Sequence, residues 1–442
     1  MIKRTRFLLI ALVVALAMTS ALVGIRFTDD VSASNSEYED LKIFTEVLTS
    51  VKRNYVEDVE TKDLVYDALK GMLKSLDPHS AFLTPDSFKE MKVETKGEFG
   101  GLGIQISIRD GMLTIISPIE DTPAWRIGLK SGDHIFKIEG EPTKDMSLFD
   151  AVKLMRGKRG TEVTITIIRK GLKKSKDYTI VRDIIKIKSV KSKTIDGEIG
   201  YLKLTAFQER SAGDMAKALK GLVTDGASGI ILDLRNNPGG LLSSAIDVSS
   251  LFLPKNQMVV YTKGRGGIKT EYRARGNAIT HSLPMVVLLN QGSASASEIV
   301  AGAMKDWKRA VVLGTKSFGK ASVQSVIPLS DGSGIRITTA KYYTPKGTLI
   351  QNTGIIPDIT VKLNSSNGAK AHPVIREKDL KGRLDNEQTG EDDGDDGGNG
   401  DNGEEKESVI LLRDLEEKDD NQLQRAVDLL KTWAVFRDLP TG

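Results

Sequence analysis

Short apolar runs that alternate with helical stretches fill residues 183–364, and this alternation constrains the fold more than any other feature. Stretches 212–222 and 242–253 carry apolar residues at helical spacing. Around them lie strand-like runs, at residues 199–205, 229–234, 258–262, 285–289, 310–314 and 335–342. Strands that alternate with helices pack in layers, with the helices against a sheet. The sequence therefore predicts an α/β core.

A serine-rich turn follows the strand-like run 285–289. It reads Gly292-Ser-Ala-Ser-Ala-Ser-Glu298, and helical spacing resumes at its end. Ser297 with Glu298 behind it suits a helix start, because a hydroxyl and a first-turn acid both favour that end. A strand-to-helix turn can also hold a serine hydroxyl in a cleft and aim free N–H groups at an oxyanion. On this segment alone, helix capping and close packing explain the serines better.

A lysine is the best candidate for a general base beside that turn. The chain has no cysteine, and none of its four histidines sits in an obvious base position beside the turn, the four being His79, His134, His281 and His372. A fold-back could still bring one of them close. A serine can instead use a neutral lysine, whose pKa of about 10.4 must fall by roughly three units. Lys320 enters a predicted strand among small and apolar residues, and Gln324 would share its strand face.

Two elements resemble those of the carboxyl-terminal processing peptidases, also called tail-specific proteases, a serine/lysine family. In Gly292-Ser-Ala-Ser-Ala-Ser-Glu298 the resemblance makes the middle serine, Ser295, the nucleophile. In Phe318-Gly-Lys-Ala-Ser-Val-Gln324 it makes Lys320 the general base and Gln324 its supporting residue. The resemblance extends over residues 37–364 and implies a protease core of the ClpP/crotonase-like fold.

A glycine-bearing turn follows the strand-like run 229–234. It reads Asp233-Leu-Arg-Asn-Asn-Pro-Gly-Gly240, which by itself is a common strand-to-helix connection. The family resemblance implies that the N–H of Gly240 is one oxyanion donor and that the N–H of Ala296 is the other. Each such donor typically contributes about 3 kcal/mol of transition-state stabilisation. We expect Asp233 and Arg235 to be a structural pair that shapes the turn.

Residues 95–182 resemble a PDZ domain of the circularly arranged bacterial type. A glycine turn runs into an alternating strand, and a helix at 148–155 and a strand at 162–169 follow. In that family the N–H groups matching Gly101, Leu102, Gly103 and Ile104 receive a peptide's terminal carboxylate, and the peptide adds a strand to the sheet edge. Ile104, Ile106 and Met155 could line a pocket for the last side chain, although core packing is at least as good an explanation for each.

The N-terminal residues 1–36 predict an export signal or membrane anchor. Lys3, Arg4 and Arg6 precede an uncharged apolar stretch at 7–25. That stretch is long enough to span a bilayer, and Val31-Ser-Ala33 would permit cleavage, so both outcomes stay open, with an uncleaved anchor favoured narrowly. In either case the body of the protein lies outside the cytoplasm, in the periplasm or an equivalent extracytoplasmic space.

Residues 37–94 predict a helical region, which the family resemblance associates with dimer contacts. The second predicted helix, at 63–76, is followed by Asp77-Pro-His-Ser80, a turn in which His79 more reasonably makes a structural hydrogen bond than takes part in chemistry. The family carries a similar element outside its catalytic set. After the core, residues 365–407 predict an acidic disordered linker, since 385–407 holds eleven acids against one lysine. Residues 408–442 predict a pair of helices that dock on the body or on a partner.

Together these features predict a multidomain α/β protein that acts as an exported serine endopeptidase and cleaves protein substrates with apolar C-terminal tails. We expect a homo-oligomer, with an adaptor protein as a further partner. Two other classes stay open: a PDZ peptide-binding scaffold with an idle protease site, and a serine acyl-transfer enzyme on cell-wall peptides. The net charge of +4 does not indicate nucleic-acid binding, and no motif indicates a cofactor or a metal. Ser317-Phe-Gly-Lys320 has the spacing of penicillin-recognising enzymes but lacks their companion motifs.

Overall fold

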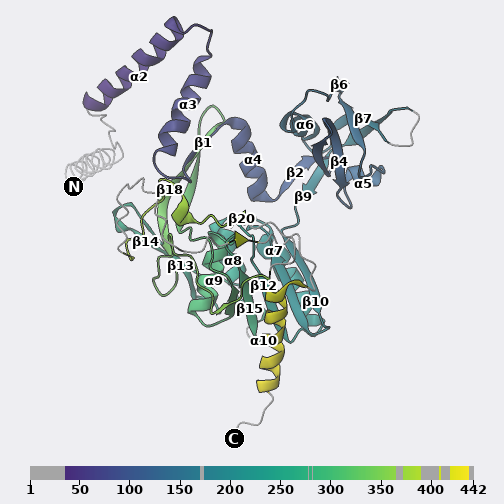
Figure 1. Cartoon of the computed structure of the whole chain (residues 1–442), viewed down its shortest axis with the longest axis vertical. Helices are drawn as coiled ribbons and strands as arrows, with labels where there is room; N and C mark the ends of the chain where they lie inside the picture. The colour runs from purple at the N-terminus through teal and green to yellow at the C-terminus, as the bar shows by residue number, and fades with distance from the viewer. Residues whose placement is uncertain are drawn as a thin grey trace, which may run out of the picture. The chain divides into compact units, whose positions relative to one another are not determined.

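The computed structural model describes residues 35–169, 174–276, 278–280, 282–364, 372–389, 408–409 and 419–437 (Figure 1). It divides into two compact units, with the boundary between Leu69 and Lys70. The first unit holds α2 (Asn35–Asn54) and the start of α3 (Thr61–Lys74), as the predicted helical region requires. Almost all of the predicted export segment lies outside the described residues. No helix within the described ranges is long and apolar enough to cross a bilayer.

A six-stranded sheet forms the centre of the protease core. Its order is β10-β11-β12-β15-β16-β19, and every neighbouring pair is parallel except β10 and β11. The strands are β10 (Val190–Ile195), β11 (Ile199–Leu204), β12 (Gly229–Asp233), β15 (Met285–Leu289), β16 (Val311–Gly314) and β19 (Ile359–Thr360). The parallel strands β12 and β15 are buried along their whole length, because helices cover both faces of the sheet.

Successive side chains of β15 pack on opposite faces of the sheet. Val287 and Leu289 contact the cluster built on α7 (Ser211–Thr224), α8 (Leu242–Ser249) and α9 (Ala296–Asp306). Val286 and Leu288 contact the apolar face of α10 (Asn421–Arg437), which lies beside β12 and β15 (Figure 1). The predicted α/β core is thus confirmed, and the C-terminal helix docks on the body of its own chain.

A second sheet is antiparallel, and most of its strands alternate in sequence with those of the first. Its order is β1-β18-β13-β14, with β17 also paired to β18, and the strands are β1 (Ala81–Leu83), β13 (Met258–Gly264), β14 (Lys269–Arg273), β17 (Ser322–Pro328) and β18 (Gly334–Tyr343). The strand-like runs 258–262 and 335–342 therefore belong to a second sheet. Pairing of β1 with β18 brings the turn at residues 77–80 next to the protease core.

The PDZ-like unit is a sheet with two short helices. Its order is β3-β4-β5-β7-β8, with β6 paired to β5, and its elements are β3 (Ile104–Arg109), β4 (Met112–Pro118), α5 (Pro123–Arg126), β5 (His134–Ile138), β6 (Glu141–Pro142), α6 (Leu148–Met155), β7 (Glu162–Ile168) and β8 (Lys176–Val181). The strands β2 (Glu98–Gly101) and β9 (Asp183–Lys186) pair with each other at its two ends. α4 (Pro85–Lys96) precedes the unit.

The first part of the predicted linker is not a free linker in the structure. β20 (His372–Pro373) pairs with β21 (Ser408–Val409), and η2 (Glu377–Asp379) follows it. Residues 374–389 make side-chain hydrogen bonds to the protease core, including one from the Asn386 amide to the carbonyl of Gln351. Residues 390–407, which carry most of the acidic charge, lie outside the described residues, as does most of the first predicted C-terminal helix.

Candidate active site

Ser295 sits at the turn between β15 and α9 in a strained backbone conformation. Its φ is 54° and its ψ is −113°, and α9 begins at the next residue. A residue other than glycine at positive φ is uncommon, costs about 1–3 kcal/mol and marks functional sites more often than other positions. Ser297, which the sequence suggested as the helix start, is buried inside the helix, and its hydroxyl donates to the carbonyl of Asn237 at 2.8 Å.

A buried carboxylate, Glu298, ties the serine turn to the segment that carries Lys320. Its Oε2 accepts hydrogen bonds from the N–H of Ser295 at 2.8 Å and the N–H of Lys320 at 3.0 Å. Its Oε1 accepts from the Ser317 hydroxyl at 2.5 Å and the N–H of Gly319 at 2.7 Å. Burial raises the pKa of Glu298 to about 7, although these hydrogen bonds oppose the rise.

Tyr342 on β18 makes a second connection between the same two residues. Its buried hydroxyl lies 3.1 Å from the carbonyl oxygen of Ser295 and also contacts the carbonyl oxygen of Lys320. The hydroxyl has one proton, so the two carbonyls share it. Burial raises the pKa of Tyr342 well above its ordinary value, and the phenol stays a hydrogen-bond donor.

Lys320 lies in the loop before β17, and its side chain is half-buried. Burial is the largest influence on its amine and lowers the pKa, as a general base requires. In the described structure the amine makes no hydrogen bond to the Ser295 hydroxyl. Gln324 donates instead to Ser322 at 2.8 Å and Thr338 at 3.3 Å. A register shift in β17 between Val323 and Gln324 interrupts the alternation on which the shared strand face depended.

The glycine turn after β12 packs directly against the serine turn. A Cβ placed on Gly239 would lie 2.9 Å from the Ala296 nitrogen and 2.9 Å from the Ser295 Cβ. Gly240 has a φ of 143°, and a Cβ there would lie 2.2 Å from the carbonyl oxygen of Phe207. The N–H groups of Gly240 and Ala296 have no hydrogen-bond acceptor among the described residues. Both predicted oxyanion donors are therefore available.

A buried ionic network fixes the strand end before this turn. Arg235 bonds Asp233 through Nη2 at 2.7 Å, and it bonds Asp420 through Nη1 and Nη2 at 2.8 and 2.7 Å. The Tyr201 hydroxyl donates to Asp233 at 2.7 Å, and Gln422 accepts from Arg235 at 3.0 Å. Burial opposes the charge on Arg235, but the two carboxylates raise its pKa overall. Asp233 and Arg235 are a structural pair. Sequence reasoning missed Asp420, the second carboxylate that pairs with Arg235.

The predicted carboxylate-binding loop lies at an open edge of the PDZ-like sheet. The carbonyls of Leu102 and Gly103 accept from Ala124 at 3.0 Å and Ile119 at 2.8 Å. The N–H groups of Leu102 and Gly103 have no acceptor within the described part of the chain. β3 is the edge strand of the sheet, so a peptide could add to it. Met155 is buried in the core of this unit, where core packing accounts for it.

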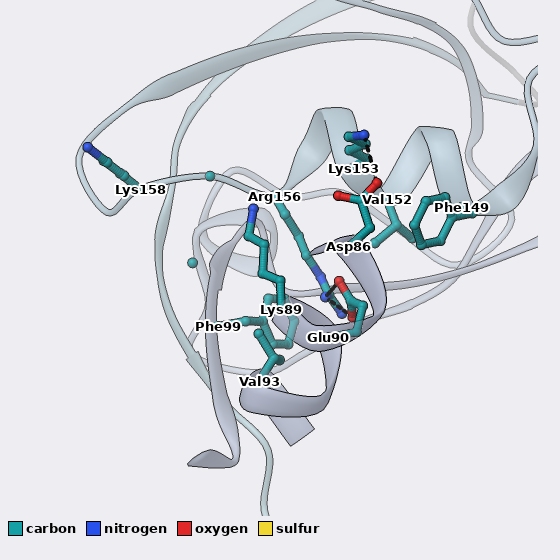
Figure 2. Close-up of a pocket in the computed structure, with 12 residues that line it drawn as sticks. Asp86, Lys89, Glu90, Val93, Phe99, Phe149, Val152, Lys153, Arg156 and Lys158 are labelled. Carbon is teal, nitrogen blue, oxygen red and sulfur yellow. Dashed lines mark hydrogen bonds and ion pairs between the residues drawn. The ribbon is translucent and has the colours of Figure 1, made fainter. Parts of the chain in front are cut away.

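A cavity of about 390 Å³ lies between α4 and α6, with Gly100 on its wall next to the predicted loop (Figure 2). Figure 2 shows two ion pairs across it, Lys153 with Asp86 at 3.1 Å and Arg156 with Glu90. Phe149 and Val152 of α6 and Phe99 of β2 add apolar surface. None of the four predicted carboxylate-binding residues lines this cavity, so it is a separate feature of the same region.

Sequence reasoning missed the connecting roles of Glu298 and Tyr342. The spacing of Ser295 and Glu298 matches a capping box, in which the acid reaches back to the N–H of the cap residue, and this signal was available. The contact of Tyr342 with Ser295 joins positions 47 residues apart, and no local pattern indicates it.

Comparison with known proteins supports a protease assignment. The model of peptidase family S41 matches residues 198–361, the PDZ domain model matches 100–180, and the model of the activating protease CtpB N-terminal domain matches 17–87. A carboxy-terminal-processing protease of Bartonella bacilliformis is 41% identical over 95% of this chain and 95% of its own length. The carboxy-terminal processing protease CtpA of Bacillus subtilis is 36% identical over 80% of this chain and 76% of its own length.

A photosystem II D1 C-terminal processing protease is 30% identical, with 73% of this chain and 92% of that chain covered and a TM-score of 0.43. The alignment with the Bartonella relative covers both the PDZ-like unit and the protease core. The family models and the Bartonella relative confirm the predicted family: the chain belongs to the carboxy-terminal processing proteases of peptidase family S41 and is a serine-type peptidase with a PDZ domain.

Proposed function

We propose that this peptidase is an endopeptidase with a Ser295–Lys320 dyad, which cleaves protein substrates near their C-termini. One observation carries the proposal: Glu298 Oε2 accepts from the N–H groups of both residues, at 2.8 and 3.0 Å. The strained φ of Ser295 and the lowered pKa of Lys320 support the same assignment. One buried carboxylate that binds the backbones of both residues brings the serine and the lysine near each other, as a nucleophile and its base must be.

The reaction follows from the chemistry of these groups. Neutral Lys320 accepts the proton of the Ser295 hydroxyl as that oxygen attacks the scissile carbonyl. The N–H groups of Gly240 and Ala296 donate to the oxyanion, and collapse of the intermediate expels the amine, which takes the proton from the lysine. Water then hydrolyses the acyl-enzyme with Lys320 again as base. The amine must reach the hydroxyl for the first step, and Gln324 would orient it when substrate binding rearranges the loop before β17.

The PDZ domain would supply specificity for the substrate tail. The N–H groups of Leu102 and Gly103 are free to receive a terminal carboxylate, and β3 offers an unpaired edge for strand addition. Gly101 and Ile104 flank these donors and complete the loop. The curated relatives are named for carboxy-terminal processing, which agrees with such a role.

We further propose that the enzyme works outside the cytoplasm. The charged start and the apolar stretch at 7–25 support export, either as an uncleaved anchor or as a signal cut near Ala33. The exposed apolar side chains of α2, among them Leu41, Phe44 and Val47, support a homo-oligomer. An adaptor protein is the further partner that we propose for delivery of substrates.

The test uses one reporter protein with a free apolar tail and the same reporter ending in Asp-Asp. Each is incubated with the purified full chain in detergent, as wild type and as Ser295→Ala. Cleavage of the apolar-tailed reporter by wild type alone is the expected result. Equal cleavage of both reporters would remove tail selection by the PDZ domain. Cleavage by Ser295→Ala would reject the dyad, and labelling by a β-lactam probe without proteolysis would favour the acyl-transfer alternative.

A further inference from the structure

Residues 374–389, which follow the protease core in sequence, lie against the loop that carries Lys320. The Arg376 guanidinium donates through Nη1 to the carbonyls of Lys316 at 2.7 Å and Ser317 at 2.8 Å. The N–H of Glu377 donates to the carbonyl of Phe318 at 3.2 Å. These bonds reach three of the four residues immediately before Lys320. The segment therefore helps to fix the lysine loop, the residues just before Lys320. It follows this loop in sequence, whereas Glu298 precedes it, and it carries neither of the proposed catalytic residues.

Glu377 is the buried centre of this contact. Its side chain has no exposed surface, and both of its carboxylate oxygens lie 2.9 Å from Nε2 of His79. Its Oε1 also accepts from the Gln351 amide at 2.9 Å. The side-chain oxygen of Gln351, Oε1, in turn accepts from the N–H of Ala321 at 2.9 Å. A continuous hydrogen-bonded chain thus runs from His79 through Glu377 and Gln351 to the residue directly after Lys320.

The far end of this chain is itself held in place. Asp77 Oδ1 accepts from the N–H groups of His79 and Ser80, each at 2.8 Å, and its Oδ2 accepts from the Ser80 hydroxyl at 2.7 Å. Arg336 of β18 donates to the carbonyl of His79 at 3.0 Å. The imidazole is mostly buried, with 16% of its side chain exposed. His79 consequently has a fixed position from which to orient the Glu377 carboxylate.

The same carboxylate acts on the charge of Lys320. Burial favours the neutral amine, and Glu377 is the largest influence in the opposite direction. The other charged groups that face the amine are Arg336, which favours the neutral form, and Asp77 and Glu298, which favour the charged one. Glu377 is faced by His79 and by Tyr342 as well. An acid from outside the core therefore contributes both to the position of the lysine and to the pKa of its amine.

We propose that Glu377, oriented by His79 and Gln351, is a positioning residue for Lys320 that fixes the lysine loop and places a negative charge beside its amine. The inference rests on the proposed role of Lys320 as the base. It adds a residue from the segment after the core to the groups that set how that base works. It also gives His79 a defined part, because the imidazole holds Glu377 in the orientation in which it bonds Gln351.

The decisive experiment is the pH dependence of kcat/KM for Glu377→Gln on the apolar-tailed reporter. The amide keeps an acceptor oxygen for Gln351 and for one tautomer of His79, but it removes the charge. Loss of a nearby opposite charge lowers the pKa of an amine, so we expect the acidic limb of the profile to move down by about one pH unit. The matched control is Glu387→Gln, on the same segment, whose carboxylate pairs with Lys341 and not with Lys320. Its limb should coincide with that of wild type.

Two further variants separate positioning from charge. Gln351→Ala keeps the Glu377 carboxylate but cuts the link to Ala321, so kcat should fall while the limb stays in place. His79→Asn should lower kcat in the same way as Gln351→Ala, because Glu377 loses its orienting partner. An activity loss in Glu377→Gln without a shift of the limb would make the residue merely structural and would overturn the proposal. An equal shift in Glu387→Gln would do the same.

A measurement that does not need catalysis tests the role of Glu377 independently of the proposed function. The rate of acetylation of Lys320 by trace acetic anhydride, followed by peptide mass spectrometry across pH, reports the titration of its amine directly. Glu377→Gln should move this curve to lower pH by the same amount, also in a Ser295→Ala background. If wild type cleaves no reporter, the proposed function fails and the acetylation curve still decides the role of Glu377. An unmoved curve would overturn that role whatever the activity of the enzyme.

Discussion

The N–H groups of Ser295 and Lys320 donate to the same atom, Oε2 of Glu298, at 2.8 and 3.0 Å. The nucleophile turn follows β15 and the lysine loop precedes β17, so two separate chain segments meet at one buried acid. The hydroxyl of Tyr342 joins the carbonyls of the same two residues from β18. The backbones of the proposed nucleophile and base are therefore held together even though their side chains make no mutual hydrogen bond in this structure.

Glu298→Gln should reduce kcat/KM by at least about 100-fold. The carboxylate accepts four hydrogen bonds, and an amide nitrogen in place of either oxygen would face two donors, which costs about 1–3 kcal/mol for each lost partner. Ser317→Ala removes only one of the four donors and is the matched control, with a much smaller loss expected. Steady-state kinetics of both variants, with circular dichroism to confirm folding, provide the measurement. Near-wild-type activity of Glu298→Gln would show that the shared carboxylate is dispensable.

Glu298 should also make the stability of the protein depend on pH in a defined direction. Because burial raises the pKa of Glu298 from 4.5 to about 7, the folded state binds a proton there more tightly than the unfolded state. This contribution is complete below pH 4.5 and is lost as the pH rises through about 7. The free energy of unfolding of wild type should therefore fall over this window relative to Glu298→Gln. Urea titrations at several pH values measure the difference, and parallel curves for the two proteins would contradict it.

Lys320→Arg should abolish proteolysis, with a loss of at least about 1,000-fold, because a guanidinium is not deprotonated and cannot serve as a base. In wild type, burial lowers the pKa of the Lys320 amine, so kcat/KM should rise with pH along a limb that lies below 10.5. Lys305→Arg, on α9 and paired with Asp358 at 3.1 Å, is the matched control and should keep its activity. Cleavage of the tailed reporter across pH tests both statements, and a fully active Lys320→Arg variant would remove the lysine from the mechanism.

Gly240→Ala should remove activity, because it displaces the oxyanion turn, as we call residues 235–240, which carry the proposed donor. A Cβ at this position would lie 2.2 Å from the carbonyl oxygen of Phe207, so the turn must move away from Ser295. The loss of one oxyanion donor costs roughly 100- to 1,000-fold in kcat. Gly226→Ala is the control, because Gly226 also has a positive φ, 89°, but open space around its Cβ. The control should show only a stability cost of about 1 kcal/mol. Equal losses of kcat in both variants would contradict the assignment.

The parts of this protein that follow from local pattern could be predicted from sequence. The helix expected at 148–155 is α6 with the same bounds, and the alternating strands and helices of residues 183–364 form the α/β core. Both depend on apolar periodicity over consecutive residues, which burial against a neighbouring layer enforces. The serine turn also follows its pattern, except that α9 begins two residues before Glu298, because Ser295 takes the cap position.

The remainder depends on contacts between distant positions. Asp420 lies 185 residues from Arg235, and Glu377 lies 298 residues from His79, so neither pair leaves a signal in one sequence. The expectation of a free linker has the same origin. Its first residues have a polar sequence that is typical of exposed chain, and the sequence does not show their partners in the core. Gln324 shows a second kind of difficulty: one register shift in β17 redirects its amide, and a strand pattern does not reveal such a bulge.

Gly103→Ala should weaken recognition of the substrate tail. Gly103 has a φ of 80°, and a Cβ there would lie 2.2 Å from the Thr122 Cβ, so the carboxylate-binding loop would be displaced. We expect KM for the apolar-tailed reporter to rise by about tenfold, with little change in kcat, because the reacting groups are untouched. Gly111→Ala is the control in the same domain, with a φ of 75° and nothing near its Cβ. A drop in kcat at constant KM would argue against tail capture by this loop.

Asp420→Asn should loosen the C-terminal helix and the oxyanion turn together. The Asp420 carboxylate accepts from both terminal nitrogens of buried Arg235, and it also accepts from the N–H of Leu423 at the start of α10. An amide cannot bind a guanidinium through two acceptors, so one buried donor of Arg235 loses its partner at a cost of about 1–3 kcal/mol.

Because Arg235 directly precedes the turn that leads to Gly240, we expect kcat/KM for Asp420→Asn to fall by roughly tenfold, equivalent to about 1.4 kcal/mol of lost transition-state stabilisation. Asp428→Asn, on the exposed face of the same helix, should change neither stability nor kinetics. Urea denaturation and reporter cleavage measure the two effects on the same protein preparations. If the variant loses stability but keeps its kcat/KM, the network anchors α10 without holding the oxyanion turn, since the active site would then tolerate a mobile Arg235.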